Sequence, residues 1–98
     1  MGYTYGRQIV CQTLRFLADT NIPSKRLSNA YSEIGVLTVD DTNKEIFQQI
    51  VEWQAKYLAA PLPELREQTI VTDPSLQKEI DELIDELVWI CIRVIEAA

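Results

Sequence analysis

Histidine is absent from the 98 residues of this chain. It is the usual general base near neutral pH and the commonest metal ligand, so every catalytic triad that contains it is excluded. Glycine is scarce as well, since only Gly2, Gly6 and Gly35 occur. Three scattered glycines form neither a phosphate-binding loop nor a dinucleotide-binding fingerprint. We therefore predict no catalytic residue, no bound metal and no cofactor from these patterns.

Cysteine is nearly as rare, and Cys11 and Cys91 lie far apart in apolar segments. A cytosolic chain seldom forms structural disulfides, so we expect both to be small, buried, apolar side chains. The longest apolar run, residues 87–98, is interrupted by Arg93 and Glu96. It is shorter than the roughly 20 apolar residues that cross a bilayer. The N-terminus lacks the basic and apolar regions of a signal peptide, so the expected location is the cytoplasm, away from membranes.

Basic residues are fewer than acidic ones: the chain has nine Lys and Arg and fifteen Asp and Glu, for a net charge of −6. The excess is uneven. Residues 1–35 carry four basic and two acidic side chains, while residues 36–98 carry five basic and thirteen acidic ones. An acidic surface repels phosphate backbones, so direct nucleic-acid binding is not expected. It suits a basic partner protein instead.

Apolar residues recur at helical spacing in four segments, which approximate residues 5–18, 24–34, 42–59 and 74–97. The sequences "DTNIP", Gly35 and "AAPLPE" separate them, and an Asp or Thr of "VDDTNKE" is expected to cap the third. Asp73 followed by Pro74 is a typical start for the fourth. The β-branched "VLTV" after Gly35 has the composition of an extended segment. We predict an all-α, compact bundle of about four helices, a single domain spanning 1–98, with the last helix central or at an interface.

The end of the last helix, "LVWICIRVIEAA", is apolar at almost every position, which raises the question of what covers the side that does not face the core. On a helical wheel one sector is apolar and is expected to face the core: Leu76, Ile80, Leu83, Ile84, Leu87, Val88, Cys91, Val94 and Ile95. The opposite sector is mostly acidic and contains Glu79, Asp81, Glu82, Asp85, Glu86, Arg93 and Glu96. Trp89 and Ile92 fall on this polar side and form a candidate patch.

Three alternatives remain for what contacts the Trp89 side chain. The N-terminal "MGYTY" can fold over it, with Tyr3 and Tyr5 against the indole. A second copy of the chain can pack there, since Trp and Tyr are favoured in interfaces and two-fold dimers are common. A different partner protein is the third. We take Trp89, Ile92, Tyr3 and Tyr5 as candidate interface residues and Glu79, Glu82, Asp85 and Glu86 as the acidic face.

Carboxylates are the remaining source of chemistry. Glu64 and Glu67 in "ELRE" precede Glu82 and Asp85 in "ELID", and carboxylates three residues apart share a helix face. This order of an ExxE and an ExxD resembles the all-α MazG-type nucleoside triphosphate pyrophosphohydrolases over about residues 64–96. The resemblance implies that these four residues bind Mg²⁺ and that the chain hydrolyses a nucleotide to its monophosphate and pyrophosphate.

The interpretation that we favour is a small, acidic, non-enzymatic protein-interaction module. It is predicted to be a homodimer through its C-terminal helix and to bind a basic partner protein. The Mg²⁺-dependent pyrophosphohydrolase is one alternative. The other is an acidic inhibitor or immunity-type protein, in which carboxylates imitate the charge of a nucleic acid.

Overall fold

The computed structural model describes residues 3–18, 23–60 and 73–97. Within them it contains four α-helices and one short 3₁₀ turn and no strand, which confirms the all-α prediction. The elements are α1 (Tyr3–Leu17), α2 (Pro23–Ile34), η1 (Val39–Asp41), α3 (Lys44–Ala59) and α5 (Pro74–Ala97). Each of the helix ends lies within two residues of its predicted position.

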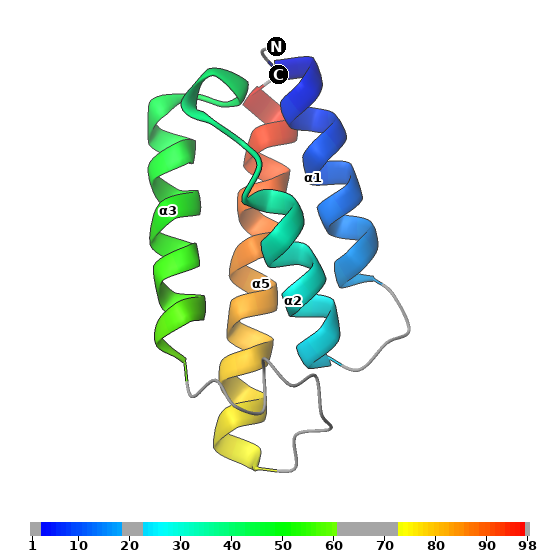
Figure 1. Cartoon of the computed structure of the whole chain (residues 1–98), viewed down its shortest axis with the longest axis vertical. Helices are drawn as coiled ribbons and strands as arrows, with labels where there is room; N and C mark the ends of the chain where they lie inside the picture. Colours follow the sequence, from blue (N-terminus) through cyan, green and yellow to red (C-terminus); the bar gives the residue numbers. More distant parts are fainter. Residues whose placement is uncertain (1–2, 19–22, 61–72, 98) are drawn as a thin grey trace.

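The helices run alternately up and down the bundle, and α5 is the longest (Figure 1). It packs against α1, α2 and α3, so the last helix is the central one. The α1 helix packs against α2 and α5 and also contacts η1, whereas α3 packs mainly on α5. None of the helices in the described ranges combines the length and apolar character that a membrane span requires.

Local hydrogen bonds explain where the elements begin. The side-chain oxygen of Asn43 accepts from the backbone N–H of Ile46 at 2.8 Å, so the cap of α3 is an Asn and not the expected Asp or Thr. Asp41 has a different role, because its Oδ2 accepts from both the N–H and the hydroxyl of Thr38, each at 3.0 Å. At α5 the Asp73 carboxylate accepts from the N–H of Ser75, as predicted.

The segment after Gly35 begins with turns at Val36 and Leu37, and only Thr38 has an extended backbone before η1. The N–H of Val36 donates to the carbonyl of Glu33, and the N–H of Leu37 donates to that of Ile34. Both bonds span three residues, so the chain continues the last turn of α2 in 3₁₀ fashion. The β-branched composition of "VLTV" was overridden by these turns, and Leu37 is buried in the core as a result.

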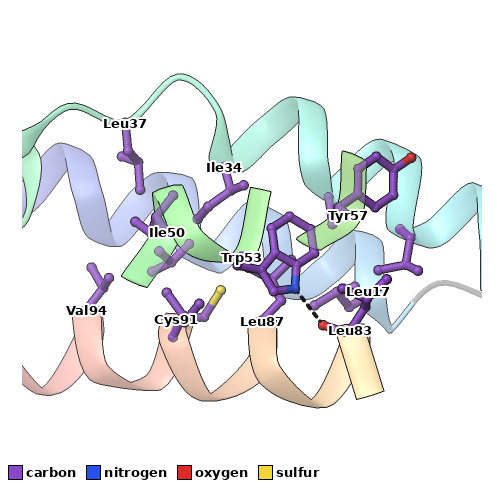
Figure 2. Close-up of a cluster of buried hydrophobic side chains, with 14 of the residues drawn as sticks. Leu17, Ile34, Leu37, Ile50, Trp53, Tyr57, Leu83, Leu87, Cys91 and Val94 are labelled. Carbon is purple, nitrogen blue, oxygen red and sulfur yellow. Dashed lines mark hydrogen bonds between the residues drawn. The ribbon is translucent and has the colours of Figure 1, made fainter. Parts of the chain in front are cut away.

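The core lies between the four helices and is centred on Trp53 (Figure 2). The indole Nε1 of this fully buried residue donates to the backbone carbonyl of Leu83 at 2.9 Å, which joins α3 to α5. Tyr57 stacks on Trp53 with ring centroids 5.8 Å apart, and Tyr31 of α2 stacks on Tyr57 at 4.6 Å. Three aromatic rings therefore fill the space between α2, α3 and α5.

Two contacts fix the position of α1. Gly6 is buried against η1, and a Cβ at this position would overlap the backbone carbonyl oxygen of Asp41. At the other end, the Arg26 guanidinium donates to the carbonyl oxygen of Leu17 at 3.0 Å. A cation at the carboxyl end of a helix pairs with its unsatisfied carbonyls and with the helix dipole.

Candidate interaction surface

The inner face of α5 is close to the predicted one. Leu76, Ile80, Leu83, Leu87, Cys91 and Val94 are buried, and Ile84, Val88 and Ile95 are half-buried against the core. Ile90 is also buried, which the wheel did not predict. It lines a hollow together with Gln49 and Glu52 of α3, so the apolar sector of α5 extends further toward α3 than the sequence periodicity alone indicates.

Trp89 is exposed to 63%, more than any other large apolar side chain in the described residues. The described part of the chain therefore leaves the indole largely uncovered. Tyr5 is half-buried and packs against the core, while the side chain of Tyr3 lies outside the described structure. Ile92 is half-buried, so the patch consists mainly of the indole.

Trp89 borders a hollow of about 290 Å³ between α3 and α5. The residues that line it with Trp89 come from both helices: Gln49, Glu52, Glu86, Ile90 and Arg93. The Oε1 atom of Gln49 is buried and has no hydrogen-bond partner in the described part of the chain. A buried acceptor without a donor costs about 1–3 kcal/mol, so a donor that reached this oxygen would be favoured. The sequence did not predict the contribution of α3, because periodicity does not show which helices are neighbours.

The acidic face is displayed as predicted, with Glu79, Glu82 and Asp85 exposed and Glu86 half-buried. Glu86 Oε1 accepts from Lys56 Nζ of α3 at 2.8 Å. This hydrogen bond and the charge of Glu86 raise the pKa of Lys56 above its ordinary value. A second hollow, of about 380 Å³, opens beside this pair. Its charged lining is Lys56, Glu79, Glu82 and Glu86.

Of the four carboxylates that the pyrophosphohydrolase resemblance implies as Mg²⁺ ligands, the structure describes two. Glu64 and Glu67 lie outside the described residues, while Glu82 and Asp85 stand exposed on α5. In the ranges 3–18, 23–60 and 73–97, no three or more Asp, Glu or Cys side chains gather closely enough to hold a metal ion. The Mg²⁺ site implied by the resemblance therefore stays a prediction.

The two cysteines differ, although both were expected to be buried. Cys91 is buried in the core of α5, but Cys11 is exposed on the outer side of α1. Burial raises the pKa of the Cys91 thiol to about 12, with a smaller contribution from Cys11. The Cys91 thiol is therefore protonated at neutral pH and is a poor nucleophile, because only a thiolate attacks readily.

Comparisons with known proteins identify no relative. No protein-family model, no curated protein and no solved structure matches the chain. The surface formed by Trp89, the adjoining hollow and the acidic face is therefore interpreted from its own chemistry.

Proposed function

We propose that this chain is a small, acidic, non-enzymatic protein-interaction module that forms a homodimer through α5. Its acidic face, Glu79, Glu82, Asp85 and Glu86, then selects a basic partner protein. The observation that carries the proposal is the exposure of the Trp89 indole beside a hollow formed by α3 and α5.

Removal of Trp89 from water supplies the driving force. Burial of an indole removes on the order of 150 Å² from water, which is worth about 4 kcal/mol at about 25 cal/mol per Å². In a two-fold dimer the same contact occurs twice. Tryptophan is also the residue type most enriched among side chains that dominate binding energy. Association also costs roughly 4–15 kcal/mol in lost translational and rotational freedom, so the two indoles act as anchors and the contacts around them supply the rest.

The acidic face supports a basic partner through its surplus of charge. Lys56–Glu86 is the one ion pair found within the described ranges. Within those ranges Glu79, Glu82 and Asp85 form no ion pair, which leaves their charges available to an incoming surface. Complementary charge of this kind speeds association and discriminates between partners more than it adds affinity.

The test of the dimer is light scattering coupled to size-exclusion chromatography on wild type, Trp89→Asp and Leu58→Asp. Leu58 is a matched control, since it is 47% exposed on α3 and takes the same substitution. We expect wild type and Leu58→Asp to be dimers and Trp89→Asp to be a folded monomer, with helix content checked by circular dichroism. A monomeric wild type, or a dimeric Trp89→Asp, contradicts the proposal.

Magnesium separates this proposal from the enzyme alternative. A chain that binds Mg²⁺ through its folded state is stabilised by mass action, and its melting temperature rises with the concentration of the ion. For an interaction module we expect the same melting temperature at 0 and at roughly 5 mM Mg²⁺, compared at equal ionic strength. A rise that Glu82→Gln abolishes would support the metal site instead.

A further inference from the structure

The outer face of α1 differs in charge from the rest of the molecule. A hollow of about 400 Å³ lies along it, lined by Thr4, Arg7, Gln8, Cys11, Gln12 and Arg15. Arg7 and Arg15 are both exposed, and no acidic residue occurs anywhere in α1. In a chain with a net charge of −6, this face is a local cationic surface.

Neither of these arginines forms an ion pair within the described residues, where Lys56–Glu86 is the single pair. The same holds for Glu79, Glu82 and Asp85 on α5. Within the described ranges, the arginines of the α1 face and three of the four carboxylates of the acidic face on α5 therefore form no ion pair, and the two helices are neighbours. Such an arrangement complements itself when two copies meet.

We infer that the basic face of α1 receives the acidic face of α5 from a second copy. This inference rests on the proposed dimer and names the surface against which α5 packs, so the second copy is itself the basic partner that the acidic face selects. Because α1 and α5 lie side by side (Figure 1), one two-fold arrangement places α1 of each copy against α5 of the other. Trp89 follows Glu86 by one helical turn and lies within the same contact.

The spacing of the charges fits this contact. Arg7 and Arg15 are eight residues apart, about 12 Å along a helix axis. The acidic stretch from Glu79 to Glu86 covers about 10 Å on the same basis. The two arginines therefore bracket the acidic face. The polar side chains between them, Gln8 and Gln12, offer amide donors to carboxylates.

Charge reversal on each face provides the test, with light scattering on Arg7→Glu/Arg15→Glu, Glu82→Lys/Asp85→Lys and their equimolar mixture. All four positions are exposed, so the helices are expected to fold, which circular dichroism verifies. Each variant alone opposes like charges twice per dimer, and we expect its self-association to weaken about tenfold or more. In the mixture the reversed faces complement each other, so we expect a heterodimer of twice the 11.2 kDa chain.

The outcomes separate this inference from the proposed function. If wild type is dimeric and both variants dimerise as wild type does, α5 packs elsewhere: the inference is wrong and the dimer stands. If both variants are monomers but the mixture stays monomeric, the pairing of α1 with α5 is likewise overturned. At roughly 0.5 mM even a weak dimer with a Kd of about 0.1 mM would form. A wild type that is monomeric at this concentration would contradict both the inference and the proposed dimer.

Discussion

At the scale of single residues, Trp53 shows how a large side chain joins two helices. Its ring is fully buried, and its Nε1–H donates to a carbonyl of α5, a group that has a second lone pair beyond the one used in the helix. Trp53→Phe removes the donor and leaves a cavity. We expect a loss of about 1–3 kcal/mol in the free energy of unfolding, measured by urea denaturation.

The matched control for Trp53→Phe is Trp89→Phe, because the same change at an exposed ring removes no buried contact in the monomer. Below the concentration at which dimers form, its unfolding midpoint should stay within about 0.5 kcal/mol of wild type. Equal losses in the two variants would mean that the hydrogen bond to Leu83 and the burial of Trp53 contribute nothing specific.

The buried thiol of Cys91 is expected to make the stability of the folded chain depend on pH. Its pKa is about 12 in the folded chain, raised from 9.0 by burial. Above pH 9 the unfolded chain loses this proton while the folded chain keeps it, so stability present below pH 9 is lost progressively toward pH 12. The slope approaches about 1.4 kcal/mol per pH unit. We expect the melting temperature to fall more steeply from pH 8.5 to 10 in wild type than in Cys91→Ala; parallel curves would contradict this.

The sequence predicted most of the residues of α5 that face inward but missed Ile90, and it also predicted, wrongly, that Cys11 of α1 is buried. A wheel assigns one direction to each residue, whereas burial depends on which helix lies opposite. Cys11 is on the outer side of α1, where nothing described covers it. Ile90 is buried on the side of α5 where Gln49 and Glu52 of α3 lie, and the periodicity of α5 cannot identify that neighbour.

At the scale of elements, helix ends were predictable because their signals are local. Gly35 ends α2, and Asp73 with Pro74 begins α5, since glycine and proline act through their own backbones. The position of η1 was not predictable. It depends on the capping bonds of Asp41 and on the close approach of Gly6, which lies more than thirty residues away in sequence.

The contact between α1 and η1 gives a prediction in which two effects oppose each other. Helix propensity alone makes Gly6→Ala stabilising by about 1 kcal/mol. The added Cβ, however, would overlap the Asp41 carbonyl oxygen, and backbone atoms cannot move aside as a flexible side chain can. We expect a net loss of about 1–3 kcal/mol in the free energy of unfolding, in line with other overpacked sites.

Thr4→Ala serves as the control for Gly6→Ala, since Thr4 is exposed two residues from Gly6, on roughly the opposite side of α1. Thermal unfolding of the two variants should therefore differ in sign, with Thr4→Ala unchanged or slightly stabilised by propensity. A Gly6→Ala variant that melts above wild type would show that α1 and η1 separate at little cost.

At the scale of the whole molecule, the candidate surface was predictable only in part. The wheel identified Trp89 and the acidic residues because both are properties of α5 alone. The hollow beside Trp89 needs Gln49 and Glu52 from α3, and the ion pair of Glu86 needs Lys56. These combinations arise from the packing of α3 on α5, so they become visible only in the folded bundle.

The two tryptophans together report on the proposed dimer without any label, because Trp53 is inaccessible and Trp89 is 63% exposed. In dilute protein, acrylamide should quench the Trp89 emission and spare that of Trp53. As the concentration rises through the dimer range, the second copy covers Trp89 and the quenching constant should fall. Trp89→Phe, which retains only Trp53, should show weak quenching at every concentration. A wild-type quenching constant that stays high where light scattering finds dimers would place Trp89 outside the interface.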